Sequence, residues 1–323
     1  MGLYTVDLTG REDSIEFGNV GNKNNELKFF VDILETRLRM ENLRSRTIHD
    51  YLKWYKHYIQ YCNSQSTYEV SKLDANSIYD WLDSMKVSDS TKNIRLKSLK
   101  ASLNRLYDMN YFKNNYWKNV RIRIDIKQKH GANENDVQKL LSTLNLNDFF
   151  GLRDAAAILL MYRTGIRNST MMQVREKHFD FSENIIYLDG SIMKNHKKLA
   201  LPIDNQLSQL LQLLIFQNSK IRNHNNVHND YLFISRIGEG ICVGGGHSNT
   251  IQKRLFKYSN KYNIENISPH GLRRGFATNL LKSGANIALI SKALGHSSLE
   301  VTTRYLDISE KELIEGLREF QNK

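Results

Sequence analysis

The chain has 323 residues, of which 40% are hydrophobic and 25% charged, which is ordinary for a globular protein with enough length for two domains. No apolar run is long enough to span a bilayer, and the first residues lack the apolar stretch of a signal peptide. The two cysteines, Cys62 and Cys242, lie far apart and form no metal-ligand spacing. We therefore expect a cytoplasmic protein with reduced cysteines and no membrane association. The net charge of +12 predicts an anionic partner, and nucleic acid is the commonest one.

The first part of the chain is predicted to be helical after an irregular polar arm over residues 1–22. Residues 23–112 place apolar side chains at helical spacing, which predicts a four-helix unit. Thr47 and Asp74 are candidate caps of the second and third helices. The fourth helix is expected over about residues 90–109, with a buried stripe formed by Ile94, Leu99, Leu103 and Leu106.

Basic residues cover the other faces of the fourth predicted helix, among them Lys92, Lys97 and Lys100. They are either a solvated helix surface or contacts to DNA phosphates, where each neutralised phosphate also releases counterions. Composition alone leaves that choice open.

Residues 113–131 are predicted to be a basic linker that carries Arg121 and Arg123. Branched apolar residues alternate with polar ones between positions 120 and 126, so part of the segment is expected to be extended. The segment is either a basic connection between two DNA-binding halves or an ordinary edge strand.

Residues 132–323 are predicted to form a second domain, which gives the whole chain a mainly α fold with a small antiparallel β-sheet. Helices are expected near residue 137 and over residues 154–163 and 207–216, with two antiparallel strands over residues 185–188 and 198–203. The connection between those strands would place Lys194 on a mobile loop. A glycine-rich turn near residues 238–246 matches no nucleotide-binding motif, and the helix after it, capped by Ser248, carries Lys253.

The densest group of reactive residues lies between Ser268 and Tyr305. Ser268 is a natural helix cap, and His270 and Arg273 follow it three residues apart, so both face one side near the positive end of a helix. Gly284 and Gly295 predict helix ends, Asn286 predicts a cap, and Ser297 with Glu300 forms a capping box. A cationic group at a helix N-terminus is typical of an anion site. Each residue alone is more simply a packing or surface residue, but the set together favours a site.

The order of these residues resembles the tyrosine recombinase, or phage integrase, family. The pattern H-x-L-R at residues 270–273 is followed by L-G-H at residues 294–296 and then by Tyr305. Upstream, residues 164–167 are similar to the T-G-[LI]-R box of the family, and residues 194–202, KNHKKLALP, are similar to its β-hairpin. The resemblance covers the chain from about residue 134 onward.

The resemblance implies an enzyme that cuts and rejoins DNA strands without metal, ATP or any cofactor. Tyr305 would attack phosphorus and form a covalent 3′-phosphotyrosine. Arg167 and Arg273 would hold the non-bridging phosphate oxygens. In this reading the first domain is a core-binding domain on DNA and the second is the catalytic domain.

Proton transfer is assigned by the same resemblance. Lys194 matches the lysine that gives a proton to the leaving 5′-oxygen, with Lys197 and Lys198 as nearby alternatives. His270 would manage the tyrosine proton, and His296 would donate a hydrogen bond to the phosphate or orient the tyrosine. No carboxylate cluster indicates a two-metal nuclease site.

Two positions depart from the family pattern. Thr170 stands where many members have a glutamate, and Arg274 stands where histidine is frequent. Neither departure removes a residue that performs the chemistry.

The implied partners are a double-stranded DNA recombination site, further copies of the chain in a tetramer, and accessory DNA-bending proteins. A terminal helix capped by Ser309 is expected to dock into a neighbouring copy. Two alternatives remain: residues 290–306 also resemble a helix-turn-helix of a non-catalytic regulator, and a type IB topoisomerase-like enzyme would share the chemistry.

Overall fold

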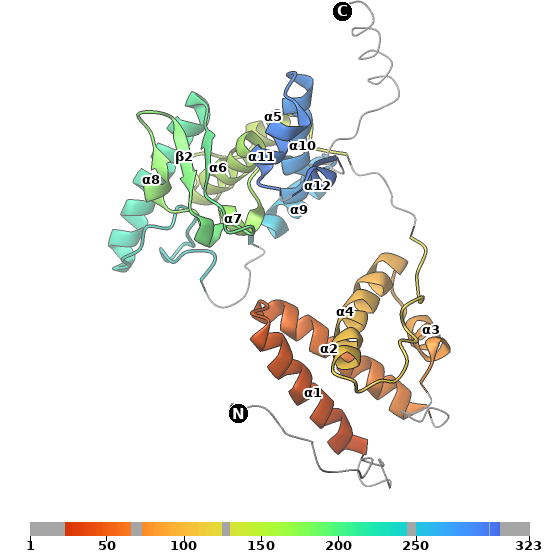
Figure 1. Ribbon diagram of the computed structural model, residues 1–323. Coiled ribbons are helices and arrows are strands. Elements are labelled where there is room, and N and C mark those ends of the chain that lie inside the picture. Colours follow the sequence, from red (N-terminus) through yellow and green to blue (C-terminus); the bar gives the residue numbers. More distant parts are fainter. Residues whose placement is uncertain (1–22, 66–72, 125–129, 244–249, 297, 304–323) are drawn as a thin grey trace, which may run out of the picture. The chain divides into compact units, whose positions relative to one another are not determined.

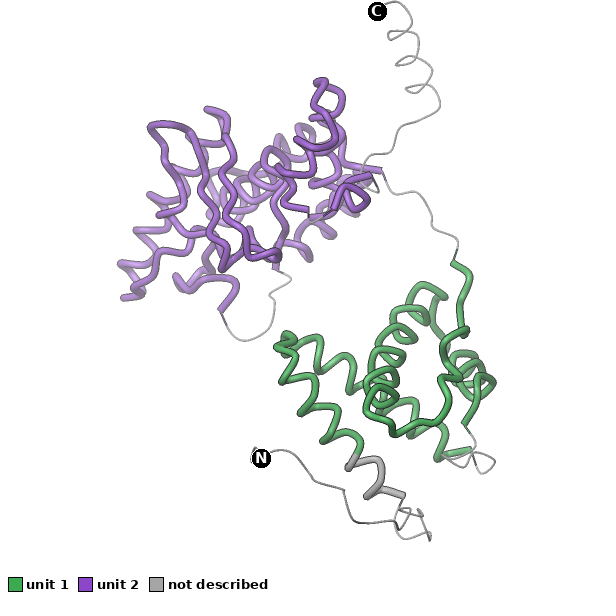
Figure 2. The backbone as a smooth tube through the Cα atoms, in the orientation of Figure 1, with its two compact units in different colours: residues 1–126 green, residues 127–323 purple. Residues whose placement is uncertain are grey.

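The computed structural model describes residues 23–65, 73–124, 130–243, 250–296 and 298–303. The chain forms two compact units, residues 1–126 and 127–323 (Figures 1 and 2). Each unit has its own hydrophobic core. The predicted arm over residues 1–22, Tyr305 and the predicted terminal helix lie outside the described residues.

The described residues of unit 1 contain four helices: α1 (Lys23–Met40), α2 (Ser45–Ser64), α3 (Ala75–Asp83) and α4 (Asp89–Asp108). The helix α2 packs against α1, α3 and α4 and lies at the centre of the unit. Large aromatic side chains fill the core, and Tyr58, Trp81 and Trp117 are fully buried. The hydroxyl of Tyr58 forms a 2.6 Å hydrogen bond with Ser77, which satisfies it inside the core.

Two local predictions for unit 1 are corrected. Thr47 is not a cap, because α2 already begins at Ser45, after Arg44. Ile94 is 64% exposed, and Leu96 is buried instead. At about 100° per residue, Ile94 lies roughly 140° around the helix from Leu99, on the solvent side. By contrast, Asp74 caps α3 as predicted, since its carboxylate accepts the N–H of Ser77 at 3.0 Å.

The predicted linker differs from the structure in its first half. Trp117 and Val120 belong to the buried core of unit 1, and the indole N–H of Trp117 donates to the side chain of Asn104 at 2.6 Å. Residues 120–124 form no strand. Burial of the Trp117 ring therefore makes the first half of the predicted linker part of unit 1, although its charge is typical of a linker.

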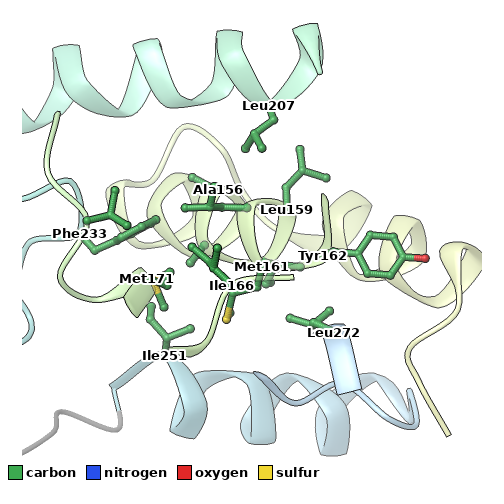
Figure 3. Packing of buried hydrophobic residues seen from close by; sticks show 14 of the residues in the cluster. Ala156, Leu159, Met161, Tyr162, Ile166, Met171, Leu207, Phe233, Ile251 and Leu272 are labelled. Carbon is green, nitrogen blue, oxygen red and sulfur yellow. The ribbon is translucent and has the colours of Figure 1, made fainter. Parts of the chain in front are cut away.

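Unit 2 is built around α6 (Phe149–Thr164), which is buried along most of its length. The helix α8 (Asn205–Asn225) packs against one side of α6, and α9 (Thr250–Tyr262) and α10 (Pro269–Lys282) pack against other sides (Figure 3). The remaining helices and turns are α5 (Glu134–Thr143), α7 (Asn168–Met171), η2 (Glu176–His178), η3 (Gly190–Ile192), α11 (Ile287–Leu294) and α12 (Leu299–Thr303).

A three-stranded antiparallel sheet completes unit 2, in the order β1 (Phe179–Asp180), β2 (Ile185–Leu188) and β3 (Leu199–Pro202). Ile186 faces Leu201 across the β2–β3 pair, and both side chains are buried. The predicted fold class, mainly α with a small antiparallel sheet, is confirmed. In the described part of the chain, no helix is long and apolar enough to cross a membrane.

A buried polar network, which the sequence did not single out, joins α6 to α9. Asp154 is 1% exposed and pairs with Arg153 at 3.0 Å, and it also accepts from Arg254 and from the hydroxyl of Tyr258. Burial and the hydrogen bond to Asp154 raise the pKa of Tyr258 to about 12. A buried carboxylate with this many donors is compensated, so the network fixes α9 relative to α6.

Candidate active site

The first part of the site is the turn after α6. The helix ends at Gly165, which takes the left-handed conformation with φ of +63°. A Cβ at this position would lie 2.2 Å from the ring of Phe276, so only glycine lets α10 approach this turn. Ile166 is buried, and Arg167 follows as the residue immediately before α7, with its side chain half-buried.

Arg273 is the central cation of the site. It projects from α10 and is 2% exposed. One terminal nitrogen donates to the carbonyl of Gly165, and the other donates to the carbonyl of Leu294 at 2.7 Å and contacts Nε2 of His296 at 2.9 Å. The guanidinium thus joins the ends of α6 and α11 to the turn that carries His296.

His296 is held in one protonation state by its neighbours. A guanidinium can only donate, so Nε2 accepts from Arg273, and the ring proton is assigned to Nδ1, which lies 2.9 Å from the hydroxyl of Thr302. Burial lowers the pKa of His296 to about 4, with further lowering by the charges of Arg273 and Arg167. The imidazole is therefore neutral at pH 7 and lies within the electrostatic reach of both arginines.

Lys194 lies on the connection between β2 and β3, and its side chain is exposed. The amide of Asn195 donates to the carbonyl of Gly295 at 3.1 Å, which brings this connection against the turn before His296. Lys197 and Lys198 follow on the same connection and are also exposed. His270 is exposed in the first turn of α10, one helical turn before Arg273.

The local signals in the 268–305 motif agree with the structure where it is described. The hydroxyl of Ser268 accepts the N–H of Gly271 at 3.0 Å, and the side chain of Asn286 accepts the N–H of Leu289 at 2.8 Å. Gly295 ends α11 in the left-handed conformation. Ser297 lies outside the described residues, so the capping box stays a prediction.

The two departures from the family pattern have different surroundings. Thr170 is 1% exposed, and its hydroxyl donates to the carbonyl of Ile192 at 3.2 Å, in the connection that leads to Lys194. Arg274 is half-buried on α10 beside Arg273.

The candidate DNA-binding residues of unit 1 differ in exposure and in their contacts. Lys97 is exposed, as are Arg121 and Arg123. Lys92 lies 3.7 Å from Asp83. The amine of Lys100 donates to the carbonyl of Lys118 at 3.1 Å. Burial, with the nearby charge of Arg121, lowers the pKa of Lys100.

A cationic cluster on α2 and α4 was missed by the sequence analysis. The guanidinium of Arg95 lies 4.2 Å from the ring centre of Trp54, and the amine of Lys53 lies 4.9 Å from it. These distances are typical of cation–π contacts. The pairing joins two helices, so no spacing within one helix could have indicated it. In unit 2, Lys253 lies on a helix, α9, as the sequence predicted, and its side chain is exposed. Among the described residues, no group of three His, Cys, Asp or Glu side chains is arranged to hold a metal ion.

The fold of the chain is that of known DNA integrases and recombinases. A structure of the Tn1549 transposon integrase in complex with a circular intermediate DNA superposes with a TM-score of 0.69 at 16% identity, covering 90% of this chain and 99% of that chain. The XerH site-specific recombinase bound to its difH substrate gives a TM-score of 0.69 at 19% identity, covering 94% and 91%. At these identities the likeness defines the fold.

The family follows from the sequence comparison. The model described as "Phage integrase family" matches residues 132–312, more than half of the chain, and the chain belongs to this family. Tyrosine recombinase XerC of Chlamydia pneumoniae is 31% identical over 176 residues, which are 54% of this chain and 53% of that protein. Tyrosine recombinase XerD of Listeria innocua is 27% identical over 189 residues, 58% and 61% of the two. The matches therefore span about half to three-fifths of the curated relatives.

Proposed function

We propose that this protein is a site-specific DNA recombinase that cuts and rejoins DNA strands through a phosphotyrosine at Tyr305. The observation that carries the proposal is the contact of Arg273 with His296, within the electrostatic reach of Arg167. One arginine in contact with a neutral histidine, and a second close enough to lower the pKa of that histidine, suit a phosphate diester whose oxygens gain charge in the transition state.

The chemical step proceeds by displacement at phosphorus. The phenolic oxygen of Tyr305 forms a bond to phosphorus, and the bond from phosphorus to the 5′-oxygen breaks. The tyrosine proton passes to His270, and Lys194 gives a proton to the leaving oxygen. The phosphotyrosine keeps the energy of the broken bond, so a 5′-hydroxyl from another strand reverses the step without ATP.

His296 supports this chemistry as the partner of Arg273. Its Nε2 accepts from the guanidinium in the structure, so we assign it first the orientation of Arg273. A bound phosphate would offset the charges of both arginines that lower the pKa of His296. The ring would then more readily carry a second proton and donate to the phosphate.

The test is covalent trapping. Denaturing the protein in the presence of DNA, followed by sequencing of the attached fragments, gives the cleaved site and the spacing between cuts. A nicked suicide substrate made from that site should then accumulate a covalent adduct with the wild-type chain and none with Tyr305→Phe. An adduct that persists in Tyr305→Phe would contradict the assignment of the nucleophile.

The partners follow from the same proposal. Double-stranded DNA is bound by the exposed cations of both units, with Lys97 and Arg121 on unit 1 and Lys253 on unit 2. Strand exchange requires two duplexes, so we propose a tetramer on paired sites, with accessory DNA-bending proteins where the spacing of the sites requires a bend. Gel shifts with one and two sites, followed by mass photometry, measure the assembly.

A non-catalytic helix-turn-helix regulator accounts less well for the site. The helices α11 and α12 do flank a glycine turn, but His296 in that turn contacts Arg273 rather than projecting outward. A regulator would bind DNA and form no adduct. A topoisomerase-like enzyme would form adducts without two paired sites, so the same assay separates all three functions.

A further inference from the structure

The connection that carries Lys194 is fixed at several points rather than hanging from the two strands. At its start, Asp189 lies 3.3 Å from the buried ring of His178. In its middle, the carbonyl of Ile192 accepts the hydroxyl of Thr170 at 3.2 Å. Met193, the residue before Lys194, is 4% exposed and packs in the core of unit 2. Lys194 is thus an exposed side chain on a backbone segment that is fixed by contacts with the rest of unit 2.

Both chain neighbours of Lys194 lie beside one glycine, Gly295. The amide nitrogen of Asn195 donates to the carbonyl of Gly295 at 3.1 Å. The terminal carbon of Met193 lies 3.3 Å from the point that a Cβ on Gly295 would occupy. The other side of the Asn195 amide accepts the N–H of Lys197 at 3.2 Å, which fixes the amide plane. The side chain of Asn195 therefore links the β2–β3 connection to Gly295 through both ends of its amide.

The link formed by Asn195 matters because Gly295 directly precedes His296. His296 is the next residue, and consecutive Cα atoms lie about 3.8 Å apart. Its ring contacts Arg273 at 2.9 Å. A short path of contacts thus connects the backbone of Lys194 to the guanidinium. A group that delivers a proton must lie within hydrogen-bond reach of the atom it protonates, so this path can set the catalytic geometry.

We propose that Asn195 is the positioning residue that holds Lys194 in register with Arg273 and His296, with Thr170 as a second support from α7. The inference rests on the proposed role of Lys194 as general acid. Asn195 acts through the backbone of its neighbour and touches no reacting atom. Loss of its bond to Gly295 lets the lysine leave the scissile phosphate while the arginine pair stays in place.

A sulfur-substituted substrate tests this inference. In a 5′-bridging phosphorothiolate the leaving atom is sulfur, which departs as thiolate without a proton. Single-turnover cleavage would be measured on the ordinary and the sulfur substrate. General acid catalysis is typically worth about 10²- to 10⁴-fold, so Asn195→Ala should slow the ordinary substrate by about 10- to 100-fold. On the sulfur substrate it should cleave within about twofold of wild type.

Three further variants sharpen the comparison. Asn195→Asp keeps an acceptor for the N–H of Lys197 but cannot donate to the carbonyl of Gly295, so it should match Asn195→Ala. Thr170→Val, which is nearly isosteric, should give a smaller loss with the same sulfur rescue. Ser191→Ala alters an exposed residue of the same connection and should match wild type on both substrates.

The outcomes distinguish the role of Lys194 from that of Asn195. If Lys194→Ala is not rescued by sulfur, the proposed general acid is wrong. If Lys194→Ala is rescued but Asn195→Ala and Asn195→Asp cleave both substrates like wild type, or are slowed equally on both, the positioning role is wrong. If Asn195→Ala fails to fold, as thermal unfolding would reveal, Asn195→Asp decides the question.

Discussion

Replacing Arg273 with methionine should destabilise unit 2 while leaving unit 1 unchanged. The methionine retains much of the stem volume but removes the donor to the carbonyls of Gly165 and Leu294 and to the ring of His296. Three hydrogen bonds to a charged donor are worth roughly 1.5–3 kcal/mol each. Relief from burying the charge returns several kcal/mol, which leaves a net loss of about 3 kcal/mol.

The expected change in melting temperature follows from the size of the unit. For a unit of about 200 residues, 1 kcal/mol shifts Tm by roughly 2–4 °C, so the variant should melt about 6–12 °C lower in unit 2. The three tryptophans of the chain, Trp54, Trp81 and Trp117, are all in unit 1. Tryptophan fluorescence therefore follows unit 1 alone, and circular dichroism follows both units.

The experiment compares Arg273→Met with Lys257→Met, which removes an exposed positive charge from α9 of the same unit. The control should melt like wild type. In Arg273→Met the circular dichroism transition should move down while the fluorescence transition stays. The pKa of His296 should also rise, because the charge of Arg273 is one cause of its lowering. An unchanged circular dichroism midpoint would refute the structural role of the guanidinium.

Three further outcomes follow from the structure. The pKa of His296 is lowered from 6.5 to about 4, so the neutral ring should add about 1–2 kcal/mol to the unfolding free energy after discounting solvent exposure. This stabilisation is fully present above pH 6.5 and is lost as pH falls toward 4. In urea titrations at several pH values, His296→Gln should remove this pH dependence. Gly165→Ala should cost about 2 kcal/mol or more of unfolding free energy through its positive φ and the overlap with Phe276, measured as a lower Tm of unit 2. Lys97→Ala should weaken DNA binding and reduce by about 1 the slope of log affinity against log salt concentration. Lys92 is already paired with Asp83, so Lys92→Ala should change this slope less.

Some helix ends could be predicted because their signals are local, whereas the starts of α2 and α6 and the end of α8 were misplaced by three to nine residues. The caps at Asp74, Ser268 and Asn286 each use a side chain and an N–H three residues later, and Gly295 needs only its own backbone freedom. The family motifs extended this to the reactive residues, whose order in the chain is visible without a structure.

Contacts between distant segments could not be predicted in the same way. The sequence assigned Arg273 to phosphate, but its partners Gly165 and Leu294 lie 108 and 21 residues away. Trp117 belongs to unit 1 because its ring packs on Tyr107 and its N–H donates to Asn104, both on α4, and the basic charge of the surrounding segment conceals this burial. Asp154 can be buried because Arg254 and Tyr258 of α9 donate to it. The alanine- and leucine-rich sequence of α6 does not indicate these distant donors.

The burial of Arg273 has a physical basis in the two helices that it joins. Gly165 is the C-terminal cap of α6, and Leu294 is the last residue of α11, so the guanidinium binds carbonyls at two helix C-termini. Such ends carry partial negative charge and offset the cost of burying a cation. Under the proposed function, the charge of Arg273 is thus oriented before DNA binds, and the neutral ring of His296 adds no positive charge beside it. A bound phosphate would then meet a fixed electrostatic field and need little reorganisation of the protein, which is the condition under which charge stabilisation is most effective.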